Sequence, residues 1–156
     1  MTFDFLVDTK PMLQDIENNP WFLKHFLGKE IYLADVRIKR GLRNADNEDL
    51  YATPAFPAFP NTTAFLTWFT EKYRFVGGKI AIHAIKGSSV LRLPERIGIY
   101  YATRQCFHLP LSSVLDYDGE IVPVGTVKNI PKSKVKIVNK TNDVAFVLAF
   151  DVKPGG

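Results

Sequence analysis

The sequence predicts an α+β fold, a small bent β-barrel of about six to eight strands with two to three short helices at its ends. From Gly77 onward, short apolar segments are separated by turn signals about every ten residues, which is typical of small barrels and strongly bent sheets. Before Gly77, two segments carry helical start signals. The length of 156 residues suits a single domain, residues 1–156, with a substantial core.

Composition excludes several classes of protein. Apolar residues make up 46% of the chain and charged residues 23%, so the chain is not disordered. No apolar run approaches the roughly 18 residues of a membrane helix, and the acidic N-terminal segment does not resemble a signal peptide. The one cysteine, Cys106, supplies neither a disulfide framework nor a zinc cluster. We therefore expect a soluble, cytoplasmic protein with no metal, no cofactor and no membrane partner.

The first part of the chain predicts helices, then a strand, then a stiff connector. Residues 9–28 form one or two short helices, because Asn19 and Pro20 make an N-cap signal and Gly28 a stop. The alternating segment 30–39 predicts a strand. Residues 54–60 have proline at every third position, the period of polyproline II. They predict a connector whose Phe rings pack on the core, with a ligand for an SH3-type groove as the alternative.

The rest of the chain predicts one helix and then only strands. Asn61 is the expected N-cap of a helix that runs to about Arg74. The last strand, 144–152, is apolar on both faces and should lie centrally in its sheet. Asp118-Gly119 and Asn142-Asp143 are expected turns. The expected strands are Lys79–Ile85, Val90–Leu93, Ile97–Thr103, Gln105–Leu109, Glu120–Lys128, Lys134–Val138 and Val144–Val152.

Few side chains with catalytic chemistry are present. Cys106 and His108 lie two positions apart on one strand, as a Cys–His nucleophile requires, but no third orienting group is evident. The acidic run 116–120 predicts a hairpin turn rather than a calcium loop. The triplets at 61–63 and 139–141 match a glycosylation pattern, which has no role without secretion.

Two strands predict a polar pocket. Lys29, Asp35 and Arg37 have the same parity, so they share one face of the first strand, with Asp35 and Arg37 roughly 7 Å apart at Cα. Lys79 and His83 share one face of a later, apolar strand. A lone strand histidine is usually structural. If His83 meets the Asp35–Arg37 pair, however, the three residues would bind a base edge and a phosphate.

The second part of the chain is basic. Residues 61–156 hold thirteen Lys and Arg against seven Asp and Glu. Lys132, Lys134 and Lys136 alternate along one strand face, which would contact the phosphates of a nucleic-acid backbone. The alternative, which the sequence does not exclude, is an edge strand that its lysines protect against aggregation.

Four segments resemble a known family. The run PWFLKHFLGKEIYLADVR, residues 20–37, is similar to the opening of ASCH domains, which belong to the PUA-like barrels. Pro20, Trp21, Gly28, Lys29, Asp35 and Arg37 stand at the family's characteristic positions. YRFVGGKIAIHA (73–84), GEIVPVGTVKNI (119–130) and AFVLAFDVKP (145–154) follow in the family's order, and a loop, polyproline and helix insertion would occupy 38–72.

The resemblance implies a PUA-like barrel whose cleft binds RNA or a modified nucleotide. Trp21, Lys29, Asp35, Arg37, Lys79 and His83 would line the cleft, and Lys132, Lys134 and Lys136 would contact phosphate. The first alternative is a small hydrolase of RNA or nucleosides, with Lys29 or His83 as acid or base, and whether the protein is an enzyme stays open. The second is a protein-binding accessory or inhibitor factor that uses the PxxPxxP ridge or a β edge.

Overall fold

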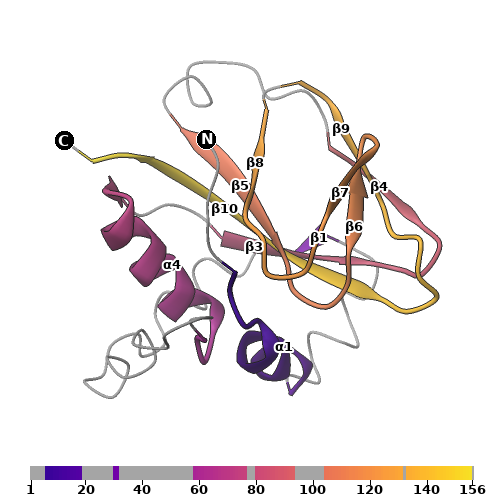
Figure 1. Ribbon diagram of the computed structural model, residues 1–156, viewed down its shortest axis with the longest axis horizontal. Helices are drawn as coiled ribbons and strands as arrows, with labels where there is room; N and C mark the ends of the chain where they lie inside the picture. Colours follow the sequence, from indigo (N-terminus) through magenta and orange to yellow (C-terminus); the bar gives the residue numbers. More distant parts are fainter. Residues whose placement is uncertain are drawn as a thin grey trace.

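The computed structural model describes residues 6–18, 30–31, 58–76, 80–93, 104–131 and 133–155. Within these residues the chain is mostly β, with two helices and two curled sheets that form a half-barrel (Figure 1). The elements are α1 (Lys10–Glu17), β1 (Glu30–Ile31), α4 (Thr62–Lys72), β2 (Phe75–Val76), β3 (Ile80–Ile85), β4 (Val90–Leu93), β5 (Gln105–Pro110), β6 (Leu115–Tyr117), β7 (Glu120–Val122), β8 (Lys128–Ile130), β9 (Val135–Val138) and β10 (Ala145–Pro154).

The first sheet has β10 near its centre, as the apolar sequence of that strand predicts. Its order is β1-β3-β10-β5-β8, and β2 pairs with the end of β10. The second sheet has the order β4-β9-β6-β7. All of these pairs are antiparallel.

The side chains of β10 divide the core into two clusters. Phe146, Leu148 and Phe150 pack with the two helices, whereas Ala145 and Val147 pack with the second sheet. This division follows from the alternation of side chains along a strand. Figure 1 shows α4 and α1 together on one side and the second sheet on the other. The first sheet is therefore covered on both faces.

Aromatic rings fill the cluster beneath the helices. Phe69 of α4 lies 5.0 Å from Phe150 of β10 and 5.4 Å from Phe107 of β5, between ring centroids. Phe59 is fully buried and packs edge-on against Phe65 at 5.5 Å. The expected packing of Phe59 on the core is confirmed, and Phe56 lies outside the described residues.

Both described helices begin near the predicted residues. Asn61 caps α4, since its side-chain oxygen accepts a hydrogen bond from the backbone N–H of Ala64 at 2.8 Å. Thr9 precedes α1, but its hydroxyl donates to the carbonyl of Leu111 at 2.7 Å instead of capping the helix. The helix containing Trp21 lies outside the described residues. No helix in the described part of the chain is long and apolar enough to span a membrane.

One predicted strand is wrong. Glu120–Lys128 is not continuous: β7 ends at Val122 and β8 starts at Lys128. Pro123 has no N–H for a ladder, and Gly125 adopts φ +84°, so the chain turns from the second sheet to the first. The predicted strand 97–103 and residues 32–39 of the first strand lie outside the described residues.

Candidate anion-binding groove

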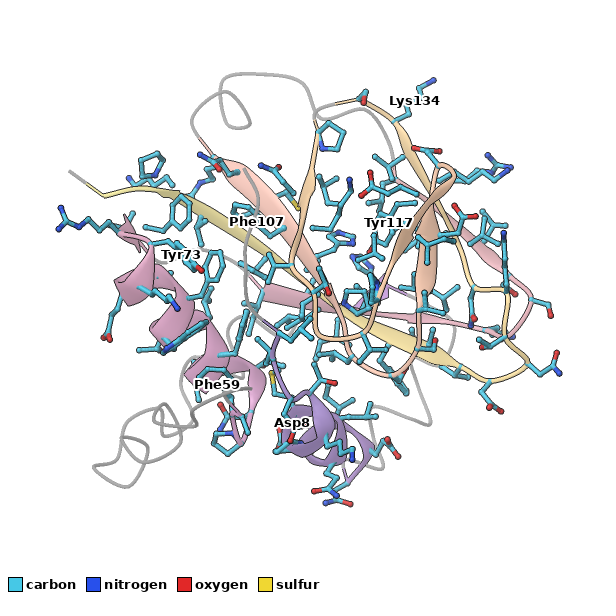
Figure 2. All side chains as sticks on the ribbon, in the orientation of Figure 1. Asp8, Phe59, Tyr73, Phe107, Tyr117 and Lys134 are labelled. Atoms are coloured by element: carbon cyan, nitrogen blue, oxygen red, sulfur yellow. The ribbon has the colours of Figure 1, made fainter. Side chains whose placement is uncertain are left out.

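A surface groove of about 480 Å³ lies on the second sheet, where β4 ends and β9 begins. It is lined by Arg92, Leu93, Asp118, Lys134, Val135 and Lys136. Figure 2 shows the side chain of Lys134 at the periphery of the molecule, beyond the start of β9. The groove thus contains two of the three lysines that the sequence predicts to contact phosphate.

The register of the sheet brings the cations together. Arg92 of β4 lies directly opposite Lys136 of β9, and both side chains are exposed. Lys134 precedes Lys136 by two residues. Leu93 lies opposite Val135 in the adjoining pair, and both line the groove, although Val135 is buried in the core and Leu93 packs against that core. Like charges at directly opposed positions repel each other, so this arrangement disfavours folding unless an anion neutralises it.

Of the described residues, none forms an ion pair with Arg92, Lys134 or Lys136. Asp118, the carboxylate among the described residues that line the groove, accepts a hydrogen bond from the backbone N–H of Lys136 at 3.1 Å. Two lysines outside the groove are paired: Lys140 lies 3.0 Å from Asp116, and Lys128 lies 2.7 Å from Glu120. The groove therefore combines three cationic side chains with one carboxylate that is already hydrogen-bonded.

The turn that supplies Asp118 has the predicted geometry. Asp118 and Gly119 both have positive φ, +52° and +94°, and they join β6 to β7 as a two-residue hairpin loop. The carboxylate of Asp116 accepts the N–H of Gly119 at 2.6 Å. The prediction of a hairpin at 116–120 is confirmed, and this hairpin holds Asp118 against β9.

The edge-strand explanation of the lysines is wrong for Lys136. β9 pairs with β4 on one side and with β6 on the other, so it is an internal strand of its sheet. An internal strand has no free backbone edge to protect. Lys136 consequently needs another explanation, and in this sheet Arg92 of β4 is the cation on a terminal strand.

His83 lies apart from this groove, in the first sheet. It is 4% exposed and faces His108, with 5.5 Å between ring centroids. Such burial disfavours a role as acid or base towards an external substrate, although no measurement tests that role. Trp21, Lys29, Asp35, Arg37, Lys79 and Lys132 lie outside the described residues. The structure thus unites Lys134 with Lys136 and separates both from His83.

The interior beside His83 contains a second polar cluster. Nδ1 of His108 lies 2.7 Å from the hydroxyl of Tyr117, and Cys106 is buried in the same core. Burial raises the pKa of Tyr117 well above its ordinary value, and Cys106 adds to the effect. With Nδ1 hydrogen-bonded to a phenol, His108 does not present this nitrogen to Cys106. In the described part of the chain, no group of three or more His, Cys, Asp or Glu residues has an arrangement that could hold a metal ion.

Sequence reasoning missed Arg92 and Asp118. Arg92 is the one charged residue of the short strand VLRL, which is a weak signal for a binding residue. The Asp118-Gly119 pair is a turn signal in the sequence, and this structural role gives no indication that Asp118 also lines a groove. Only the register between β4 and β9 brings Arg92 opposite Lys136, and a single sequence contains no information about that register.

Comparison with known proteins gives neighbours in structure only. No family model and no curated protein sequence matches the chain. A Cupin_2 domain of an XRE family transcriptional regulator from Enterobacter cloacae is 10% identical, over 54% of this chain and 86% of that chain, with a TM-score of 0.39. A cupin protein from Bacteroides fragilis is 15% identical, over 56% and 75%, with a TM-score of 0.37. The EutQ protein of Clostridium difficile is 17% identical, over 55% and 61%, with a TM-score of 0.34.

These findings correct the resemblance to ASCH domains. The similar structures are cupin-fold proteins rather than PUA-like ones, and no family model supports an ASCH domain. The PUA-like fold class and the binding of RNA or a modified nucleotide in its cleft are therefore wrong as expectations, together with the alternatives that depended on that fold. TM-scores below 0.5 do not assign this chain to the cupins either, so its function has to be argued from its own residues.

Proposed function

We propose that this protein is a binding module that holds an anionic group of another molecule in the groove between β4 and β9. The observation that supports this proposal is the direct opposition of Arg92 and Lys136. Neither cation forms an ion pair within the described residues, although nearby Lys128 and Lys140 both do. A bound anion would remove the repulsion between them and would accept charge-assisted hydrogen bonds from both.

The shape of the groove fits a ligand that is more than a bare ion. A volume of about 480 Å³ lies within the range of sites for small organic groups. The half-buried Leu93 adds a small apolar surface beside the cations, whereas Val135 is buried in the core beneath them. The ligand that fits best has carboxylate or phosphate groups next to an apolar portion. Because the cations are exposed, binding should weaken as salt concentration rises.

Isothermal titration with inorganic pyrophosphate tests the proposal, at low and at physiological ionic strength. A charge-assisted hydrogen bond contributes about 1.5–3 kcal/mol, so Arg92→Gln and Lys136→Gln should each weaken binding about tenfold or more. Lys153→Gln is the matched control, since Lys153 is an exposed lysine near the end of β10 and does not line the groove. An absence of pyrophosphate binding at low salt, or an equal loss in the control, would exclude the groove as an anion site.

A further inference from the structure

The groove lies beside β4, a terminal strand of the second sheet among the described residues. β4 is the terminal strand in the order β4-β9-β6-β7, and within the described residues it pairs only with β9. Backbone N–H and C=O groups on such an edge are available to another strand. The location of Arg92 on this strand places a cation of the groove directly at the edge.

The hydrogen-bond pattern identifies which backbone groups face outward. The N–H of Asn139 donates to the carbonyl of Ser89 at 2.9 Å, so 89 and 139 form a hydrogen-bonded pair. In an antiparallel ladder bonded and non-bonded pairs alternate, which makes 91/137 and 93/135 the bonded pairs. The backbone groups of Val90 and Arg92 consequently point away from β9, towards the open edge.

The opposite side of β9 confirms this pattern independently. Lys136 is the partner of Arg92, and its backbone should point towards β6 if its pair with Arg92 is non-bonded. The carbonyl of Lys136 accepts the N–H of Asp118 at 2.9 Å, and its N–H donates to the Asp118 carboxylate at 3.1 Å. Lys136 therefore uses its backbone on the β6 side and leaves Arg92 free to pair outward.

The side chains on this face have the spacing of an extended peptide. Lys134 and Lys136 are two residues apart, roughly 7 Å along an extended strand, which is also the spacing of alternate side chains in any strand added to β4. Val90 is 44% exposed and lies two residues from Arg92, so it shares the face of the cations. A strand added to β4 would lie two strand spacings from β9, roughly 10 Å, a distance that an extended Lys and an extended Glu side chain span together.

We infer that the anionic ligand of the groove is an acidic peptide segment of another protein, which adds to β4 as a further strand. One carboxylate pairs with the opposed Arg92 and Lys136, the next carboxylate, two residues along, pairs with Lys134, and an apolar side chain two residues in the other direction covers Val90. The backbone groups of Val90 and Arg92 supply the main-chain hydrogen bonds. This inference rests on the proposed anion-binding function, and it names the class of partner that the site accepts.

Synthetic peptides of identical composition test the inference. One heptapeptide carries Val at position 1 and Glu at positions 3, 5 and 7, so that all four share one face, with Val at the positions between them. The second peptide carries the three Glu consecutively. Two further peptides have the sequence of the first. One is N-methylated on the backbone amides of its odd-numbered residues, and the other on those of its even-numbered residues, so that each blocks one edge of the strand. The alternating peptide should bind at least tenfold more tightly than the consecutive one, and only one of the two methylated peptides should lose at least tenfold in affinity.

Variants of β4 separate charge from strand pairing. Val90→Pro removes an outward N–H that has no partner within the sheet, and proline is tolerated on edge strands. It should weaken the alternating peptide at least tenfold and leave pyrophosphate binding unchanged, with circular dichroism as the control for folding. Hydrogen exchange of the wild-type protein provides a second measurement. Saturation with the peptide should slow exchange of the Val90 and Arg92 amides and not of the Leu91 and Leu93 amides.

The outcomes distinguish this inference from the proposed function. Equal binding of the alternating, consecutive and methylated peptides, with pyrophosphate still bound, would refute strand addition and leave a simple anion site. If the wild-type protein also fails to bind pyrophosphate, both strand addition and the proposed anion-binding function are refuted. Displacement of the peptide by single-stranded RNA at lower concentration than by pyrophosphate would refute the peptide class in favour of a nucleic acid. Unchanged exchange at Val90 and Arg92 under saturating peptide would also refute strand addition.

Discussion

The hydroxyl of Tyr117 on β6 lies 2.7 Å from Nδ1 of His108 on β5, and this contact joins the two sheets. A second link runs beside it, since Glu120 is the strand partner of Tyr117 and Lys128 is the strand partner of His108. The side chains of Lys128 and Glu120 form an ion pair at 2.7 Å. The two links hold the β6–β7 hairpin, which carries Asp118 of the groove, against the first sheet.

Tyr117→Phe should lower the free energy of unfolding by about 1–3 kcal/mol, because it leaves a buried imidazole nitrogen without its hydrogen bond. Urea unfolding at neutral pH measures this loss. Lys128→Gln removes the neighbouring, partly exposed ion pair and should cost less than about 1 kcal/mol. An equal effect of both substitutions would contradict the importance of the buried link.

The same tyrosine should make the protein sensitive to alkaline pH. Burial raises the pKa of Tyr117 above its ordinary value of 10.0, so the folded state holds this proton more tightly than the unfolded state. The contribution is complete below about pH 10 and decreases as pH rises towards the folded pKa. The stability difference between wild type and Tyr117→Phe should therefore be constant up to about pH 9 and shrink as pH rises above about 10, measured by urea unfolding at each pH. A difference that stays constant over the whole pH range would contradict the prediction.

Gly125→Ala should destabilise the protein more than Gly119→Ala. Both glycines have positive φ, which costs a residue with a side chain about 1–2 kcal/mol. A Cβ on Gly125 would also lie 2.5 Å from the carbonyl oxygen of Val7, whereas a Cβ on Gly119 would meet nothing within 4 Å. The difference in melting temperature between the two variants measures the cost of the clash with Val7, because the backbone strain is common to both. Equal melting temperatures would show that the segment containing Val7 shifts away from the new Cβ at no cost in stability.

The elements of this fold that are set by local sequence could be predicted. Asn61 begins α4, Asp118-Gly119 forms the hairpin turn, and the apolar strand 145–154 lies inside its sheet, each for a reason within a few residues. The break after Val122 has local signals in Pro123 and Gly125, which the strand prediction passed over. The direction of the chain after the break was not predictable, since it follows from backbone bonds of Gly125 to Val7 and Pro110. The PUA-like assignment failed because short motifs were assembled without knowledge of strand order.

The candidate site could be predicted only in part. The alternation of side chains along residues 134–136 correctly predicted that Lys134 and Lys136 share one exposed face. Arg92 joins them through strand register, and that register follows from packing between β4 and β9 rather than from either segment alone. The explanation by edge protection failed for the same reason, since the position of β9 within the sheet is a property of the whole fold.

Asp116→Asn should reduce stability at neutral pH and have no effect in acid. A hydrogen bond from Lys140, then the N–H of Gly119, lowers the pKa of Asp116 below its ordinary value of 3.8. A lowered folded pKa gives stability that is present above about pH 4 and is lost as pH falls through the folded value. Melting temperatures of wild type and variant should therefore differ at pH 7 and converge by about pH 2. A difference that persists in acid would assign the effect to packing.

Asn139→Ala should be far more destabilising than Asn142→Ala in the same turn. The buried amide of Asn139 donates to the carbonyls of Ile85, Lys86 and Asp143 at 2.8–3.2 Å, and its oxygen accepts from Thr141. Removing it leaves buried carbonyls unpaired, at about 1–3 kcal/mol or more, whereas Asn142 is exposed. Chemical denaturation compares the variants. Because these bonds occupy the amide, the Asn-Lys-Thr triplet serves the turn between β9 and β10, and equal stability of both variants would contradict this role.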